Sequence, residues 1–183
     1  MADWTSGYTA AQLDEAQERY EVRFPRDLID LLSERRPARG YDWHTEDPRI
    51  REMLNWPFDL LLFDVENGFW WPDWGDRPTS AEERAEVLRA VLKRVSRLIP
   101  LLGHRFLPET PSEEGNPVFS MHGFDTIYYG RDLTDYFQHE FSVRLFDRVP
   151  VKQDYKFIPF WSDLVEKPEV GYAFYEAEVS SRR

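Results

Sequence analysis

Two acidic side chains close together are the first residues of this chain that could carry out catalysis. Asp64 and Glu66 are two positions apart on a predicted strand, so both carboxylates would project from the same face. Such pairs act as acid and base in glycosidases, and nearby tryptophans could form a platform for a sugar ring. The competing interpretation is a structural network, in which arginines of a neighbouring basic helix neutralise both carboxylates. We favour the network, because acidic pairs on strands are common and catalytic pairs are rare.

Other kinds of catalytic site lack their usual motifs. None of the four histidines, His44, His104, His122 and His139, has a second one at metal-binding spacing, and the chain has no cysteine to supply a thiolate. His104 and His122 lie in the strands of the motif-bearing region and could approach each other across the sheet. The interpretation that we favour is that each hydrogen-bonds a backbone carbonyl or a carboxylate and orients the strands. The sequence holds neither a G-x-S-x-G elbow nor a glycine-rich phosphate loop. We therefore predict no enzymatic activity, no cofactor and no metal.

The stretch from Gly40 to Asp76 combines aromatic and acidic side chains. It holds five of the seven tryptophans, and nine acidic residues against two basic ones. Aromatic anchors ringed by carboxylates suit the capture of a basic protein, because the rings supply buried area and cation–π contacts while the charges speed and orient association. The residues predicted to bind a partner are Asp42, Trp43, Trp71, Asp73, Trp74 and Asp76.

The alternative for each of these tryptophans is a place in the hydrophobic core. Alternation along a strand would bury Trp70 or Trp71, but not both. Asp73 and Asp76 are the residues of this segment that we most expect to be exposed.

Charge and composition narrow the class of partner and the compartment. A net charge of −11 opposes binding to nucleic acid, whose phosphates require a positive field, and favours a basic protein partner. The chain starts without a basic region followed by an apolar run, and it has no apolar stretch long enough to span a bilayer. We therefore expect a soluble, cytoplasmic protein without membrane contact, whose 183 residues form a single domain, 1–183, with its own core.

Capping signals and apolar periodicity predict the helices. Thr9 and Gln12 form a capping box at the start of the first helix, and Ser80 begins the longest one, which has an apolar and a basic face. Asp132 is a candidate N-cap for a later helix. The predicted helices cover 10–20, the residues between Pro25 and Pro37, 47–57, 80–100 and 133–141, with a short helical turn after Ser162.

Short runs of β-branched and aromatic residues predict the strands. Asn67 and Gly68 are typical of a hairpin turn, which would join two of these strands. The predicted strands cover 61–65, 69–71, 99–107, 118–120, 126–129, 156–161 and 172–175. This order of elements indicates an α+β fold, with N-terminal helices packed against an antiparallel sheet and further helices between and after its strands.

The stretch 115–141 contains Gly-Asn-Pro-Val-Phe-Ser at 115–120, Asp125, Ile-Tyr-Tyr-Gly at 127–130, Asp132, Leu133, Tyr136, Glu140 and Phe141. This set of residues resembles a branch of the SUKH superfamily, whose name-giving member is a fungal cell-wall-assembly regulator. Further segments resemble motifs of the same superfamily and occur in the same order as in its members. They lie at 24–28, 64–71, 74–75, 77–78, 99–100 and 103–108. The asparagine-glycine-glycine turn that usually follows the early proline-led motif is absent, and 33–37 stands in its place.

The resemblance implies a SUKH-like fold and, for a bacterial member, an immunity protein that neutralises a secreted toxin. With the acidic field and the missing catalytic motifs, this suggests a non-enzymatic module that binds a basic toxin domain, for example a nuclease. Two alternatives stay open. One is a glycan hydrolase that uses Asp64, Glu66 and the tryptophans; the other is a regulatory scaffold with several weak partners.

Overall fold

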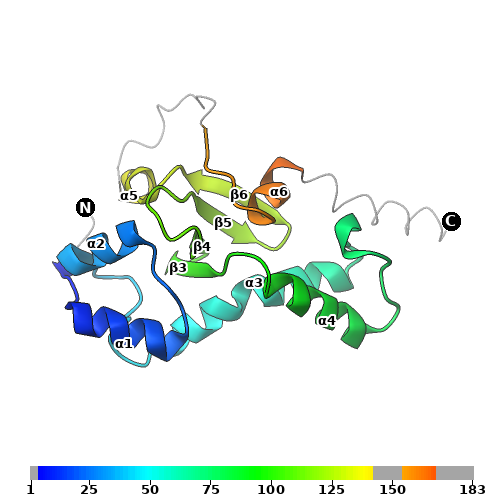
Figure 1. Cartoon of the computed structure of the whole chain (residues 1–183), viewed down its shortest axis with the longest axis horizontal. Coiled ribbons are helices and arrows are strands. Elements are labelled where there is room, and N and C mark those ends of the chain that lie inside the picture. Colours follow the sequence, from blue (N-terminus) through cyan, green and yellow to red (C-terminus); the bar gives the residue numbers. More distant parts are fainter. Residues whose placement is uncertain (1–3, 142–153, 168–183) are drawn as a thin grey trace.

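The computed structural model describes residues 4–141 and 154–167, which form helices and antiparallel strands in an α+β fold (Figure 1). The helices are α1 (Ala10–Tyr20), α2 (Arg26–Glu34), α3 (Pro48–Glu66), α4 (Ala81–Leu92), α5 (Leu133–Phe141) and α6 (Trp161–Glu166), with a 3-10 helix, η1, at Pro72–Trp74. The strands are β1 (Trp4–Ser6), β2 (Arg35–Pro37), β3 (Leu98–Leu102), β4 (Arg105–Pro108), β5 (Val118–His122) and β6 (Asp125–Gly130).

The larger sheet is a four-stranded antiparallel meander in the order β3-β4-β5-β6. The strand structure predicted over 99–107 is present as two strands, because the chain turns at Gly103 and His104 and runs back as β4. Gly103 has a φ of 52°, a left-handed conformation that other residues adopt only at a cost. The strands predicted at 118–120 and 126–129 are confirmed within β5 and β6.

The N-terminal helices carry a second, two-stranded sheet. α1 begins with the predicted capping box, in which Thr9 and Gln12 exchange hydrogen bonds. α2 ends where β2 begins, and β2 pairs antiparallel with β1. The sequence analysis did not predict this small sheet, whose strands are three residues each.

α3 corrects two predictions. The predicted helix end at Pro57 and the predicted strand at 61–65 are both wrong, because one continuous helix covers both. Pro57 costs that helix a backbone hydrogen bond. However, the side chains buried along α3 recur at helical spacing, and burial of this face offsets the cost. They are Ile50, Pro57, Leu61 and Val65.

Asn67 and Gly68 end α3 instead of forming a hairpin turn. Gly68 has a φ of 103°, and the amide of Phe69 donates to the carbonyl of Asp64 at 3.0 Å. This is the bonding pattern of a helix C-terminus that closes through a glycine. The strand predicted at 69–71 is therefore wrong, and the chain passes into η1.

The remaining elements are confirmed in part. Ser80 caps α4 as predicted, but the helix ends at Leu92, and Leu98 and Ile99 belong to β3. Asp132 accepts a hydrogen bond from the amide of Asp135 at the start of α5. No strand forms at 156–161, where α6 begins instead, and the strand predicted at 172–175 lies outside the described residues.

Two hydrophobic clusters hold these elements together. The first joins α1, α2 and α5 to the sheet through Ile99, Leu107 and Val118. The second joins α3, α4 and α6 to it through Phe106 and Phe119. α3 contributes to both clusters, so this long helix ties the two halves of the molecule together.

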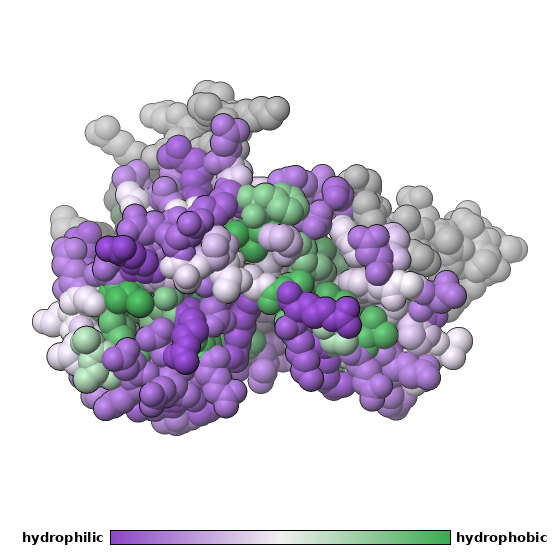
Figure 2. Space-filling model, viewed as in Figure 1, coloured by the Kyte–Doolittle hydropathy of each residue, from purple (hydrophilic) through white to green (hydrophobic). Residues whose placement is uncertain are grey.

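The surface in Figure 2 is mostly hydrophilic, with a few small hydrophobic patches, one of them beside α4. Among the described residues, none of the helices combines the length and apolar character needed to cross a bilayer.

Candidate functional site

The structure separates the six predicted contact residues into two groups. Asp42 and Trp43 precede α3, whereas Trp71, Asp73, Trp74 and Asp76 follow it. α3 has 19 residues and is therefore about 28 Å long. Figure 1 shows the two groups' segments at opposite ends of this helix. The six residues do not form one continuous patch.

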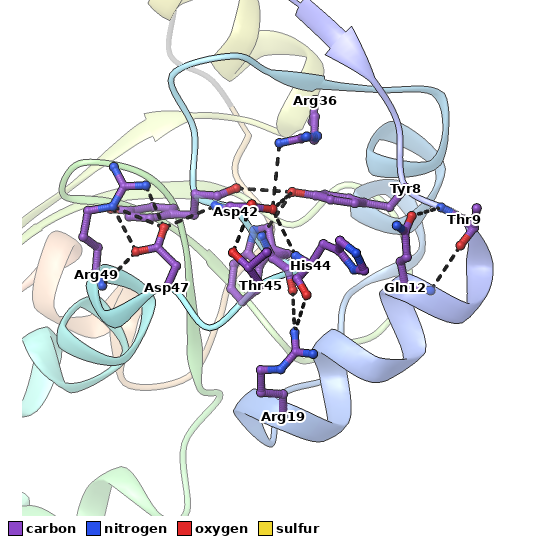
Figure 3. Close-up of polar contacts among 12 residues, drawn as sticks. Tyr8, Thr9, Gln12, Arg19, Arg36, Asp42, His44, Thr45, Asp47 and Arg49 are labelled. Carbon is purple, nitrogen blue, oxygen red and sulfur yellow. Dashed lines mark hydrogen bonds and ion pairs between the residues drawn. The ribbon is translucent and has the colours of Figure 1, made fainter.

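Asp42 organises the loop that leads into α3 (Figure 3). Its carboxylate accepts hydrogen bonds from the Tyr8 hydroxyl at 3.2 Å, the His44 amide at 3.2 Å and the Thr45 hydroxyl at 3.0 Å. Burial acts to raise the pKa of Asp42, but the bonds from Thr45, His44 and Tyr8 outweigh it and lower that pKa. With its oxygens engaged in this way, Asp42 is part of the loop's own structure.

Replacing Asp42 with asparagine should lower the free energy of unfolding by about 1 kcal/mol at neutral pH, a modest value because the side chain is 40% exposed and screened. The folded-state pKa of Asp42 is depressed, so its contribution is complete above the unfolded value of about 3.9 and is lost as pH falls through the folded value. Urea unfolding of both proteins should therefore give curves that converge in acid. Asp14→Asn, at an exposed position of α1, is the control. Equal stability at neutral pH would contradict a role for the Asp42 hydrogen bonds.

Trp43 lies in the core. Its side chain is 4% exposed, and its ring meets those of Tyr20 and Phe24 edge-on, at 5.5 and 5.0 Å between centroids. Asp47, just before α3, is also buried. Its side chain caps α3 and forms an ion pair with Arg49. This end of α3 is thus built for stability.

The segment after α3 packs its tryptophans inward. Trp70 and Trp71 are 0% and 6% exposed, so both are buried, contrary to the alternation expected of a strand. The Trp70 indole donates to the carbonyl of Gly75 at 2.7 Å and closes the turn around η1. Trp74 is half-buried and lies against Trp70, Phe124 and Phe160. These contacts fix the segment to the β5–β6 turn and to the start of α6.

Acidic side chains cover the outside of this segment. Between Pro72 and Glu86, every charged residue that is exposed is acidic; we call these five, Asp73, Asp76, Glu82, Glu83 and Glu86, the acidic surface. The two basic residues of the stretch turn inward: Arg77 donates to the carbonyl of Val65, and Arg84 is 9% exposed. The sequence analysis predicted Asp73 and Asp76 as partner-binding residues. It did not include the three glutamates, because their positions in the sequence indicated only the first turns of a helix.

Arg84 holds the end of α3 through Glu66. Its guanidinium makes two hydrogen bonds to the Glu66 carboxylate, and these bonds lower the pKa of Glu66. It also donates to the carbonyls of Pro78 and Thr79. The expected neutralisation by a basic helix therefore holds for Glu66.

Asp64 has a different environment. It lies on α3, not on a strand, and accepts a hydrogen bond from the Phe124 amide at 2.8 Å; burial raises its pKa. Gly123 approaches so closely that an added Cβ would lie 2.0 Å from an Asp64 carboxylate oxygen. Asp64 thus fastens α3 to the β5–β6 turn, and it lines neither of the two large clefts found among the described residues.

Two glycine-to-alanine variants measure this contact. Gly103 and Gly123 both sit in hairpin turns at positive φ, but a Cβ at Gly103 meets nothing within 4 Å. Gly103→Ala should cost about 1 kcal/mol of unfolding free energy, the penalty of the left-handed conformation. Gly123→Ala should cost about 3 kcal/mol, because it also displaces the Asp64 carboxylate and leaves a buried amide without its acceptor. Equal losses in denaturant unfolding would contradict the fastening role of Asp64.

The two strand-associated histidines approach each other, but among the described residues neither ring makes the hydrogen bond to a backbone carbonyl or carboxylate that we favoured. The ring centroids of His104 and His122 are 5.2 Å apart, edge to face, and burial together with Arg105 and His122 lowers the pKa of His104. Within residues 4–141 and 154–167, no group of three or more histidine or acidic side chains is arranged to hold a metal ion.

Comparisons of the chain with protein-family models, with curated proteins and with solved structures each found no match. The SUKH resemblance therefore stays a prediction made from the sequence.

Proposed function

We propose that this protein is a non-enzymatic binding module that captures a basic protein through its acidic surface, and that it acts as an immunity protein against a toxin domain. The observation that carries the proposal is the single sign of the exposed charges between Pro72 and Glu86. The SUKH resemblance supplies the immunity role. The proposal includes a cytoplasmic location, with which a chain lacking cysteine is compatible.

The architecture beneath the acidic surface suits this task. Trp70, Trp71 and Trp74 anchor the segment before a partner arrives, so little conformational entropy is lost on binding. The carboxylates would steer a basic partner and orient it during its approach. The half-buried ring of Trp74 offers a place for an arginine or lysine to stack.

Neutralisation would follow from occlusion of a basic cleft. Asp73 and Asp76 would take the place of a substrate's negative charges, as phosphates would in a nuclease. Asp42 and Trp43, which the sequence analysis grouped with them, have no part in this contact, because they precede α3 whereas Asp73 and Asp76 follow it. The three glutamates of α4 would instead add to the negative field of Asp73 and Asp76.

The test begins with capture. The purified protein is immobilised, lysate of its source cells is passed over it at low and then moderate salt, and the retained proteins are identified by mass spectrometry. A single basic protein should remain, and its binding domain, expressed alone, should arrest growth unless this chain is co-expressed. Several weakly held proteins would favour a regulatory scaffold. An empty column from cells that express the neighbouring genes would contradict the proposal and favour glycan hydrolysis assays.

A further inference from the structure

A groove runs between α3 and the segment that joins α4 to β3. It has a volume of about 860 Å³. Its apolar lining comes from α3, from the end of α4 and the segment that follows it, from the start of β3 and from α6, and consists of Leu54, Pro57, Phe58, Leu92, Val95, Leu98 and Trp161. Figure 2 shows hydrophobic residues exposed beside α4, bordered by hydrophilic ones.

The charged residues at this groove are mostly basic, in contrast to the rest of the molecule. From Val87 to Pro108 the chain has five arginines and lysines and not one acidic residue. Three of these, Arg89, Lys93 and Arg97, are exposed and line the groove, together with Asp59 and Glu109. The sign of the exposed charge thus reverses along α4, from the acidic surface to this groove.

Two of the three cations are available to a ligand. Arg89 stacks over the ring of Phe58 at 5.0 Å, and among the described residues neither Arg89 nor Lys93 forms an ion pair. Arg97 donates to the backbone carbonyl of Glu21 and also interacts electrostatically with Glu109, which lines the same groove, so its charge is balanced in part within the protein. Positive side chains around an apolar floor are complementary to an anionic ligand with an apolar part.

We propose that the groove binds an acidic peptide segment of a partner protein, with a large apolar side chain of the segment between Phe58 and Leu92 and its carboxylates on Arg89, Lys93 and Arg97. A nucleic acid fits less well, because its many phosphates would meet the repulsion of the nearby acidic surface. A few carboxylates around one apolar anchor match both the size and the charges of the groove. This proposal does not depend on the toxin-neutralising function, and it uses the opposite half of α4.

Two neighbouring residues give a matched pair of variants. Lys93 and Arg94 are both exposed at the end of α4, but only Lys93 lines the groove. The probe is a short fluorescein-labelled peptide with glutamates on both sides of a phenylalanine–leucine pair, followed by anisotropy. Lys93→Glu should raise the dissociation constant by about tenfold or more, and Arg94→Glu by about threefold or less. Circular dichroism and thermal unfolding would show that both variants keep the fold.

Further probes and variants test whether the groove itself holds the peptide. The same peptide with lysines in place of the glutamates should not bind, and Phe58→Ala should weaken binding of the acidic peptide. Equal losses in Lys93→Glu and Arg94→Glu would overturn the proposal, since only the general field would then matter. So would displacement of the peptide by a single-stranded oligonucleotide, or no binding at millimolar peptide. Asp73→Lys with Asp76→Lys should leave peptide affinity undiminished, so a failure here is distinct from a failure of basic-protein capture.

Discussion

Replacing Trp70 with alanine should lower the free energy of unfolding by about 3–5 kcal/mol. The side chain is 0% exposed and belongs to the cluster that joins α3, α4 and α6 to the sheet. Its removal leaves a cavity and also deprives the Gly75 carbonyl of its indole donor. Because a domain of this size is stable by only about 5–15 kcal/mol, this one change should bring the protein close to unfolding.

Two comparison variants divide the Trp70 effect into its parts. Trp70→Phe keeps most of the apolar volume and loses the indole N–H, so it should cost about 1–2 kcal/mol. Phe63→Ala removes an aromatic ring from the same end of α3, but Phe63 is 64% exposed and its loss should be nearly neutral. Urea unfolding followed by circular dichroism measures all three. A loss below about 1 kcal/mol for Trp70→Ala would show that the segment after α3 is not part of the core.

The elements that the sequence predicted well carry their signals locally. The capping box of Thr9 and Gln12 fixes the start of α1, and Ser80 and Asp132 do the same for α4 and α5. In each case, a side chain satisfies an amide within three residues, so no distant contact is needed. The β5–β6 hairpin could likewise be predicted, from two short runs of strand-forming residues around Gly123.

α3 shows where local signals fail. Pro57 is a helix breaker by intrinsic preference, but burial of Leu61 and Val65 against the sheet and α4 determines the structure there. Asn67 and Gly68 supply a positive φ, which both a hairpin turn and a helix C-terminus require. Whether Asn67 and Gly68 form a hairpin turn or a helix C-terminus depends on whether the residues before them are strand or helix, and here α3 extends to Glu66. The buried spacing of Pro57, Leu61 and Val65 was the signal that could have indicated a continuous helix.

The candidate site was half predictable for the same reason. Once the segment at 69–71 is not a strand, nothing limits burial to one of Trp70 and Trp71, and both enter the core. The acidic residues of the segment are exposed as expected, whereas Asp42 and Trp43 are separated from them by α3. Sequence proximity within the window from Gly40 to Asp76 suggested one surface, but a helix of 19 residues separates its ends.

Reversing two charges of the acidic surface should change association more than any other exposed substitution. Asp73→Lys with Asp76→Lys is expected to slow binding of the captured basic protein by about tenfold or more at low salt, because the steering field in front of Trp74 changes sign. The unfolding free energy should change little, since both side chains are exposed. Stopped-flow or surface-based association rates at two salt concentrations measure the effect.

The control places the same charge change at the other end of the molecule. Asp14→Lys with Glu18→Lys, at two exposed positions of α1, also raises the net charge by two units per substitution, from −11 to −7. At moderate salt, where exposed charges are screened beyond about 10 Å, this variant should associate nearly as fast as the unchanged protein. An equal slowing in both variants would show that net charge alone matters. An unchanged rate for Asp73→Lys with Asp76→Lys at low salt would mean that the acidic surface does not meet the partner, and the binding face would have to lie elsewhere.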